Sequence, residues 1–267
     1  GWPSFMAKEI ADQPQAVADT LMGRVDSEGK VTIPEMDGLS AEDIRNIDRI
    51  IIVACGTASY AGDIAKYGIE KWSRIPVQVE LSHEFRYRDP IVTKNTLIVA
   101  ISQSGETMDT LMATRYARDL GAKVLAICNT QGATLARESD ATIYTHAGPE
   151  VAVASTKALV AQITAGFLLG LYLAEVRGGT DSAELHKLGR ELLKVPALVS
   201  TVVKELVQAK ELGAEMANAK SVLFLGRNVG FPVAMEGALK LKELAYIHAE
   251  GFAAGELKHG PIALIEE

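Results

Sequence analysis

Short apolar runs alternate with longer stretches of helical spacing over most of this chain. The clearest runs are continuous, as in strands buried on both faces of a sheet; they lie at residues 49–54, 96–101 and 123–128. Weaker strand patterns lie at residues 76–81 and 140–144. Helical spacing follows at residues 59–72, 107–120 and 155–174. This alternation predicts an α/β fold, with a parallel sheet between two layers of helices.

The first 44 residues have a different pattern, with helical spacing up to Leu21 and a turn-rich stretch from Gly23 to Gly38. We interpret residues 1–44 as a helical arm on the main body. On the expected helix at 107–120, Met108, Leu111, Met112 and Tyr116 share one face, which we expect to be the buried one.

Residues 180–218 are helical and lack a strand pattern, with Pro196 as a predicted interruption. A strand pattern then restarts at 221–226, and a helix is expected from Pro232 to His248. This order repeats the first strand and helix of the sheet. The predicted organisation has four segments: an arm (1–44), a complete subdomain (45–179), a helical connector (180–218) and part of a second subdomain (219–267).

The longest apolar stretch runs from Ala158 to Ala174. It is shorter than the roughly 20 residues that a membrane-spanning helix needs, and Gln162 and Thr164 interrupt it. We therefore expect a buried helix of a globular domain and no membrane association.

Composition and net charge narrow the range of possible functions. The chain has 267 residues and a net charge of −7, whereas nucleic-acid-binding proteins usually carry a basic patch. Cys55 and Cys128 are the only cysteines; they are far apart and outside any CxxC motif, which fits a reducing cytoplasm and indicates no metal site. We therefore expect a cytoplasmic protein that binds no nucleic acid.

The segment Ser102-Gln103-Ser104-Gly105-Glu106-Thr107 joins an apolar strand to a helix. The first turn of a helix has unpaired N–H groups and a partial positive charge, and the hydroxyl groups here add neutral donors. The segment therefore predicts a phosphate site that needs no metal. An ordinary helix-capping loop is the alternative, because Ser104 and Thr107 are also good N-cap residues.

Cys55-Gly56-Thr57 occupies the same kind of position after the first strand, where ligands of open α/β sheets bind. Cys55 would serve as a nucleophile only with an activating base, and none lies nearby in the sequence. We favour a small buried side chain at this position.

Two further groups suggest proton chemistry. Glu236, Lys240 and Glu243 fall on one face of the expected helix, either as a solvated ion-pair stripe or as a rigidly held base and amine. His259 lies in a segment rich in Gly and Pro, where its ordinary pKa near 6.5 suits a proton shuttle. A surface histidine without a catalytic role is the alternative.

Taken together, these motifs strongly resemble the isomerase (SIS) half of the glutamine:fructose-6-phosphate aminotransferases, the glucosamine-6-phosphate synthases. The resemblance covers essentially the whole chain. The motifs that carry it are Cys55–Thr57, Ser102–Thr107, Ala126–Asn129, Arg137–Asp140, Val153–Lys157, Glu236–Glu243 and Gly255–Pro261.

The resemblance implies two SIS subdomains of three-layer αβα fold, in a homodimer. It implies synthesis of glucosamine 6-phosphate from fructose 6-phosphate and ammonia, the first step of amino-sugar synthesis. A separate glutaminase domain would supply the ammonia, and no cofactor or metal is implied. Glu243 would move the proton between C1 and C2, Lys240 would assist at the neighbouring oxygens, and His259 of the partner subunit would open the sugar ring.

The resemblance also assigns substrate-binding residues. These are Ser102, Gln103, Ser104 and Thr107 for the phosphate, and Cys55, Gly56, Thr57, Glu150 and Val153 for the sugar. One departure concerns Ala58, where the family commonly has a phosphate-binding Ser; Ser59 is a candidate substitute.

The resemblance also implies that the glutaminase domain, the rest of the second subdomain and a tail with a substrate-contacting Lys lie outside this sequence. We therefore expect it to be a fragment that binds sugar phosphate but has weak or no isomerase activity. Two other classes stay open: a different SIS phosphosugar deaminase or isomerase, and a non-catalytic phosphosugar sensor.

Overall fold

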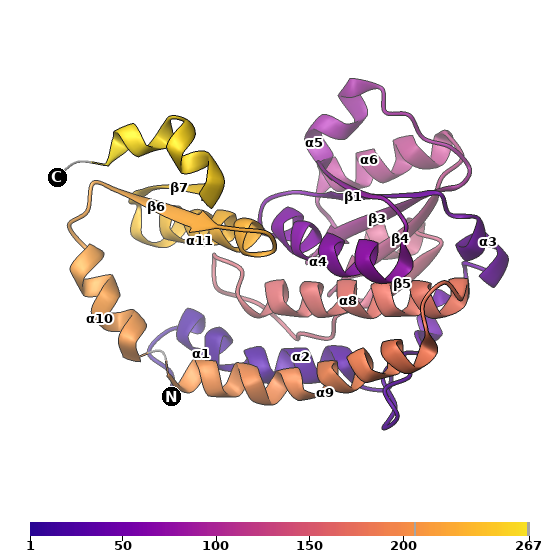
Figure 1. Cartoon of the computed structure of the whole chain (residues 1–267), viewed down its shortest axis with the longest axis horizontal. Coiled ribbons are helices and arrows are strands. Elements are labelled where there is room, and N and C mark those ends of the chain that lie inside the picture. Colours follow the sequence, from indigo (N-terminus) through magenta and orange to yellow (C-terminus); the bar gives the residue numbers. More distant parts are fainter. Residues whose placement is uncertain (206, 266–267) are drawn as a thin grey trace. The chain divides into compact units, whose positions relative to one another are not determined.

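The computed structural model describes residues 1–205 and 207–265. It divides into two compact units, unit 1 (Gly1–Thr201) and unit 2 (Val202–Glu267) (Figure 1). The finer division into four segments stays a prediction.

Unit 1 is built on a five-stranded, wholly parallel sheet with the strand order β2-β1-β3-β4-β5. The strands are β1 (Arg49–Ala54), β2 (Val77–Leu81), β3 (Thr96–Ser102), β4 (Lys123–Cys128) and β5 (Ala141–Tyr144). Every residue of β3 is buried, and in β1 and β4 only the first residue is not. The three continuous apolar runs are thus confirmed as fully buried strands, because helices cover both faces of the sheet.

The helices form two layers around this sheet. Their bounds are α1 (Phe5–Ala11), α2 (Gln13–Leu21), α3 (Ala41–Asn46), α4 (Thr57–Ser73), α5 (Ser82–Phe85), α6 (Met108–Asp119), α7 (Thr134–Glu138), α8 (Lys157–Arg177) and α9 (Ser182–Lys204), with short 3₁₀ turns η1 (Pro34–Met36) and η2 (Arg86–Arg88). One core cluster joins the sheet to α2, α4 and α8, and a second joins its other face to α5, α6 and α7 (Figure 1). The predicted three-layer αβα fold is confirmed.

The apolar helix α8 packs directly on α4. At Gly166 an added Cβ would lie only 2.4 Å from the Cβ of Ala65, so this glycine permits the close approach of the two helices. By length and composition alone α8 would suit a membrane span, but 61% of its most apolar 18-residue stretch is buried inside the protein. Core helices of globular domains have the same properties, and the predicted buried helix is confirmed.

Two expectations about helices are wrong. Met108, expected on the buried face of α6, is 62% exposed, and Leu111 is buried together with small residues such as Ala113 and Ala117. The buried residues of α6 are Thr110, Leu111, Ala113, Thr114 and Ala117. In addition, α9 continues through Pro196 without interruption.

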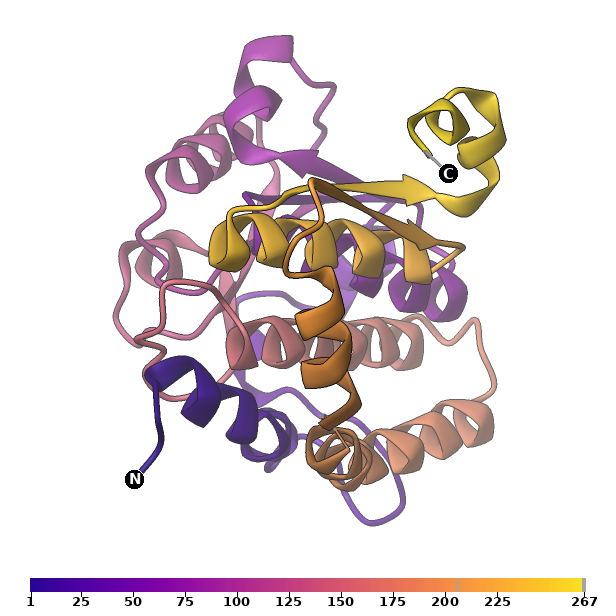
Figure 2. The same ribbon diagram turned by 90° about the vertical axis from the view of Figure 1, so that its left-hand side faces the viewer.

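Unit 2 contains α10 (Val207–Met216), β6 (Ser221–Gly226), α11 (Gly230–Ala245), β7 (His248–Ala253) and the 3₁₀ turns η3 (Ala254–His259) and η4 (Pro261–Leu264). Strands β6 and β7 are parallel neighbours, and α11 lies along one face of the pair (Figure 2). This strand–helix–strand order repeats β1–α4–β2, so the predicted internal repeat is present.

Candidate active site

The strand order of unit 1 fixes where a ligand is expected. The chain moves outward from β1 to β2, then returns to place β3 on the other side of β1. In open parallel sheets, ligands bind at the carboxyl ends of the strands where the order reverses in this way. A cavity of about 190 Å³ lies at this position, between the loops that follow β1 and β3. It is lined by Cys55, Thr57, Ala58, Ile101, Ser102, Gln103, Ser104, Thr107, Thr110, Ser155 and Gln162.

The loop after β3 presents hydroxyl groups and a helix N-terminus to this cavity. Ser102 Oγ accepts a hydrogen bond from the Gly105 amide at 3.0 Å and lies 3.1 Å from Thr107 Oγ1. Thr107 is the N-cap of α6, yet its side chain makes no capping hydrogen bond. The first-turn N–H groups of α6 have no acceptor within the helix, and an anion satisfies such groups well. The lining residues include neither Lys nor Arg, so the donors of this site are neutral.

Neighbouring segments hold the loop in place. The Gln103 carbonyl accepts from the Asn129 amide at 3.1 Å, and the Gly105 carbonyl accepts from the Leu135 amide at 3.0 Å. The Glu106 carboxylate accepts from the Thr134 amide at 2.7 Å, and this hydrogen bond lowers the pKa of Glu106 below its ordinary value. These contacts organise the loop before any ligand arrives.

Gly105 is required at its position. Its φ of +67° lies in the left-handed region, and an added Cβ would lie 2.6 Å from the Cβ of Ala133 and 2.7 Å from Cys128 Sγ. The buried Cys128 therefore packs beneath the loop, and burial raises the pKa of its thiol.

The turn after β1 supplies the opposite wall. Cys55, Thr57 and Ala58 line the cavity, whereas Gly56 does not and has open space where a Cβ would stand. Ser59 is buried and donates its hydroxyl to the Gly56 carbonyl at 2.6 Å. Ser59 therefore caps its own turn, and at the position of the missing family Ser the cavity has only the methyl group of Ala58.

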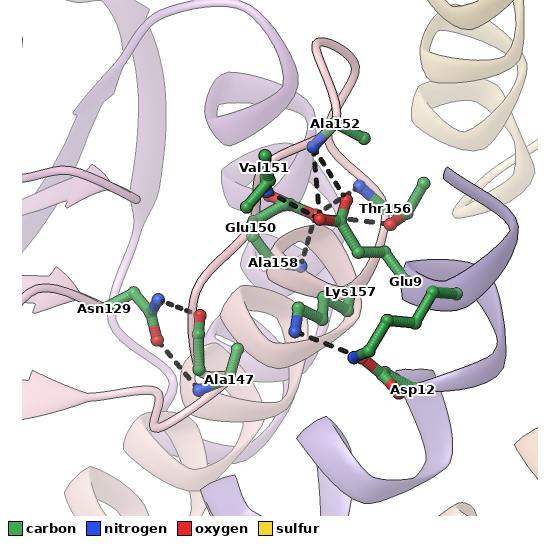
Figure 3. A network of polar contacts seen from close by, with 12 residues as sticks. Glu9, Asp12, Asn129, Ala147, Glu150, Val151, Ala152, Thr156, Lys157 and Ala158 are labelled. Atoms are coloured by element: carbon green, nitrogen blue, oxygen red, sulfur yellow. Dashed lines mark hydrogen bonds and ion pairs between the residues drawn. The ribbon is translucent and has the colours of Figure 1, made fainter. Parts of the chain in front are cut away.

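A third wall comes from the loop before α8. The Glu150 carboxylate accepts hydrogen bonds from the Thr156 amide at 2.8 Å and the Ala158 amide at 3.3 Å (Figure 3). It also accepts one from Ser155 Oγ at 3.2 Å. Glu150 thus caps the start of α8 and holds Ser155 at the cavity. Val153, at the tip of the same loop, is 98% exposed. Neither Glu150 nor Val153 is among the lining residues.

The N-terminal arm holds this loop from the other side. Glu9 of α1, only 2% exposed, accepts from the amides of Val151 at 2.6 Å and Ala152 at 3.1 Å (Figure 3). Nearby, the buried Lys157 contacts Asp12 at 3.4 Å. The arm therefore positions a loop that forms part of the cavity.

The remaining predicted residues lie in unit 2. On α11, Lys240 Nζ is 2.5 Å from Glu243 Oε2 and 3.5 Å from Glu236 Oε1. Glu236 is nearly buried, whereas the Glu243 side chain is 35% exposed and accessible to a reactant. His259 ends the 3₁₀ turn η3 and is exposed. The predicted ionic stripe is present, and the catalytic roles of these residues stay predictions.

Sequence reasoning missed several residues at the cavity. It singled out Val153 in the motif Val153–Lys157 and not Ser155, and it treated Gln162 as an interruption of an apolar stretch. A polar side chain in the middle of a buried helix was the available signal for Gln162, because such a side chain needs a partner. Among the described residues, no group of three or more His, Cys, Asp or Glu side chains is placed to hold a metal ion.

Comparisons with known proteins define the class. The model of the SIS domain family matches residues 43–171 and 215–267, which include the cavity loops of unit 1 and the repeated unit. The chain belongs to the SIS domain family.

Individual relatives are more informative than the family as a whole. The chain is 64% identical over 267 residues to the glutamine–fructose-6-phosphate aminotransferase (isomerizing) of Corynebacterium glutamicum and 60% identical to that of Streptomyces coelicolor. It is covered completely in both comparisons but spans 43% of the length of these relatives. Its structure matches the C-terminal domain of the Francisella tularensis glucosamine–fructose-6-phosphate aminotransferase with a TM-score of 0.94 and 40% identity, covering all of this chain and 74% of that one.

Proposed function

We propose that this chain is the isomerase part of a glutamine–fructose-6-phosphate aminotransferase. In this proposal, fructose 6-phosphate and ammonia react to glucosamine 6-phosphate and water. The observation that carries the proposal is the cavity at the strand-order reversal, with its neutral hydroxyl donors and the N-terminus of α6. Identity of 64% to relatives that bear this name supports the same reaction.

The phosphate is assigned to Ser102, Gln103, Ser104 and Thr107. Hydroxyl and amide donors bind a phosphate dianion without a metal, and the α6 N-terminus adds a favourable partial charge. Cys55 and Thr57 are assigned to the sugar, with Gly56 at the open side of the same turn. Val153 is assigned a backbone contact, and Glu150 contributes by holding the loop that carries Ser155.

The isomerisation requires one proton to move between two carbons. After ammonia has replaced the C2 oxygen and released water, the product is an imine at C2. Glu243 then takes a proton from C1 and returns it at C2, while the proton of the C1 hydroxyl passes to the imine nitrogen, so that C1 becomes an aldehyde and C2 carries an amine. Lys240 stabilises the oxygen at C1, and its contact with Glu243 orients the carboxylate. His259 of the partner subunit opens the furanose ring in the first step. The Glu243 side chain is 35% exposed and His259 is exposed, so a reactant has access to both, and Lys240 lies beside Glu243.

The proposal also covers the localisation, the oligomeric state and the partners of the protein. The protein is expected to be a cytoplasmic homodimer without nucleic-acid or membrane partners, and a glutaminase domain would supply ammonia from glutamine. The reaction as written needs no cofactor.

The decisive test is Glu243→Gln in the whole protein, assayed for glucosamine 6-phosphate with ammonia as nitrogen donor. Loss of a general base is expected to lower kcat by a factor of about 10² to 10⁴. Glu215→Gln, at an exposed position of α10, is the matched control. An unchanged rate in Glu243→Gln would refute the catalytic assignment.

The reaction products distinguish the proposed synthase from the two other classes, a different SIS enzyme and a non-catalytic phosphosugar sensor. A deaminase would release ammonia from glucosamine 6-phosphate, and a sensor would bind sugar phosphates without turnover. Either result in the wild-type protein, in place of synthesis, contradicts the proposed reaction.

A further inference from the structure

One side chain of the cavity lining has a buried oxygen atom without a hydrogen-bond partner in the described part of the chain. Gln162 comes from α8, lines the cavity and is only 3% exposed. Its Oε1 atom is buried and has no hydrogen-bond partner among the described residues. A buried polar group in this state is costly, and native structures rarely keep one without a function.

Several hydroxyl groups of the cavity lining make contacts with other residues. Thr110 Oγ1 lies 3.0 Å from Ser82 Oγ, a buried pair between α6 and α5. Ser155 donates its proton to Glu150, and Ser102 is paired with Thr107. None of these groups donates to Gln162 Oε1, and an occupant of the cavity can supply the donor.

The chemistry of Gln162 Oε1 indicates which part of a ligand would contact it. A carboxamide oxygen accepts hydrogen bonds, so it is complementary to O–H groups and unsuited to the oxygens of a phosphate dianion. The phosphate already has its own donors in the Ser102–Thr107 loop. A sugar phosphate brings both features, because its phosphate is attached to a chain of hydroxyl donors.

We infer that Gln162 is a specificity residue that accepts a hydrogen bond from a hydroxyl group of the sugar. This inference rests on the proposed function and deepens it, because it separates recognition of the sugar from recognition of the phosphate. A site that hydrogen-bonds a substrate hydroxyl discriminates strongly against ligands that lack it, since the buried acceptor is then left unpaired.

The test compares the affinities of fructose 6-phosphate and inorganic phosphate, measured by calorimetry on the same protein. Gln162→Met keeps the side-chain volume and removes the amide. It is expected to weaken fructose 6-phosphate binding about 10- to 100-fold, because a buried hydrogen bond is lost. Affinity for inorganic phosphate is expected to change less than about twofold, because phosphate does not reach this acceptor.

Gln162→Glu is the second variant and keeps the shape and an acceptor oxygen. Its added negative charge weakens both ligands, but the preference for fructose 6-phosphate over phosphate is expected to stay. Gln78→Met, at an exposed position of β2, controls for the substitution itself.

The outcomes distinguish this inference from the proposed function. If Gln162→Met weakens both ligands equally, or neither, Gln162 does not read the sugar and the inference is wrong. A wild-type protein that binds both ligands with equal affinity refutes the inference and leaves the phosphate site in place. A wild-type protein that binds neither ligand refutes the proposed function and the inference together.

Discussion

The strand–helix–strand unit occurs twice in this chain, and its first strands are buried to different extents. In β1, Ile50 to Ala54 are fully buried between two neighbouring strands. In β6, Val222, Leu223 and Phe224 are only half-buried and Leu225 is 47% exposed, with β7 as the one paired strand among the described residues. The two sequences are similarly apolar. Burial of a parallel strand therefore depends on its neighbours in the sheet as much as on its own residues.

The largest expected effect contrasts matched substitutions in these two strands. Ile51→Ala in β1 removes a fully buried side chain and is expected to lower the free energy of unfolding by about 2–5 kcal/mol. Leu223→Ala in β6 removes a half-buried side chain of similar size and is expected to cost about half as much or less. Urea unfolding combined with hydrogen exchange in each unit measures both values. Equal losses would break the comparison.

A second prediction examines how tightly the carboxyl edge of the larger sheet is packed. Gly105→Ala places a methyl group against Ala133 and Cys128, and also adds the strain of a positive φ. We expect a loss of about 2–4 kcal/mol in stability and loss of phosphate binding. Gly132→Ala is the control, because Gly132 has a similar φ of +71° but no atom within 4 Å of the added Cβ. If the two variants behave alike, backbone strain alone explains the effect.

A third, smaller effect concerns the arm that holds the loop before α8. Glu9→Gln keeps one oxygen acceptor but removes the charge that strengthens its bonds to the Val151 and Ala152 amides. We expect a loss of about 1 kcal/mol, with faster hydrogen exchange at these two amides. Glu184→Gln, exposed on α9, is the control. Unchanged exchange at Val151 and Ala152 would contradict the role of Glu9.

The smallest effect distinguishes the two cysteines of unit 1. Burial raises the pKa of Cys128, so the folded protein keeps this thiol protonated at a pH where the unfolded chain ionises it. The stability that the protonated Cys128 thiol contributes is therefore present below the pKa of this thiol in the unfolded chain, and it is lost as the pH rises above that value. Iodoacetamide at pH 8 is expected to modify Cys55, which lines the cavity, about tenfold or more faster than Cys128. Fructose 6-phosphate should slow the reaction at Cys55 alone, and peptide mass mapping measures both sites.

Much of unit 1 was predictable from local pattern. The bounds of β1 and β4 agree with the apolar runs at 49–54 and 123–128, because strands covered on both faces cannot contain polar interruptions. The loop from Ser102 to Thr107 was also recognisable, since hydroxyl residues between a buried strand and a helix are a local feature. The resemblance to the SIS family rested on this loop together with six other motifs, in their order along the chain.

Other features depended on residues far apart in the sequence. The buried face of α6 was misjudged at Met108, because tertiary packing, and not the hydrophobic spacing alone, decides which side of a helix faces the sheet. The assignment of Glu150 to the sugar stays a prediction, and the contacts of its carboxylate with Ser155 and the start of α8 were not foreseen from the sequence.

The sequence by itself determined where the strands and helices lie and which loop carries the anion-binding chemistry, because these follow from hydrophobic periodicity and local hydrogen bonding. Only the tertiary structure decided the strand order β2-β1-β3-β4-β5, and with it the meeting of Cys55, Ser102 and Gln162 around one cavity. Strand order is set by packing between segments distant in the chain, so no local pattern reveals it. The buried Oε1 atom of Gln162, which has no hydrogen-bond partner among the residues that the structure describes, is a product of that packing.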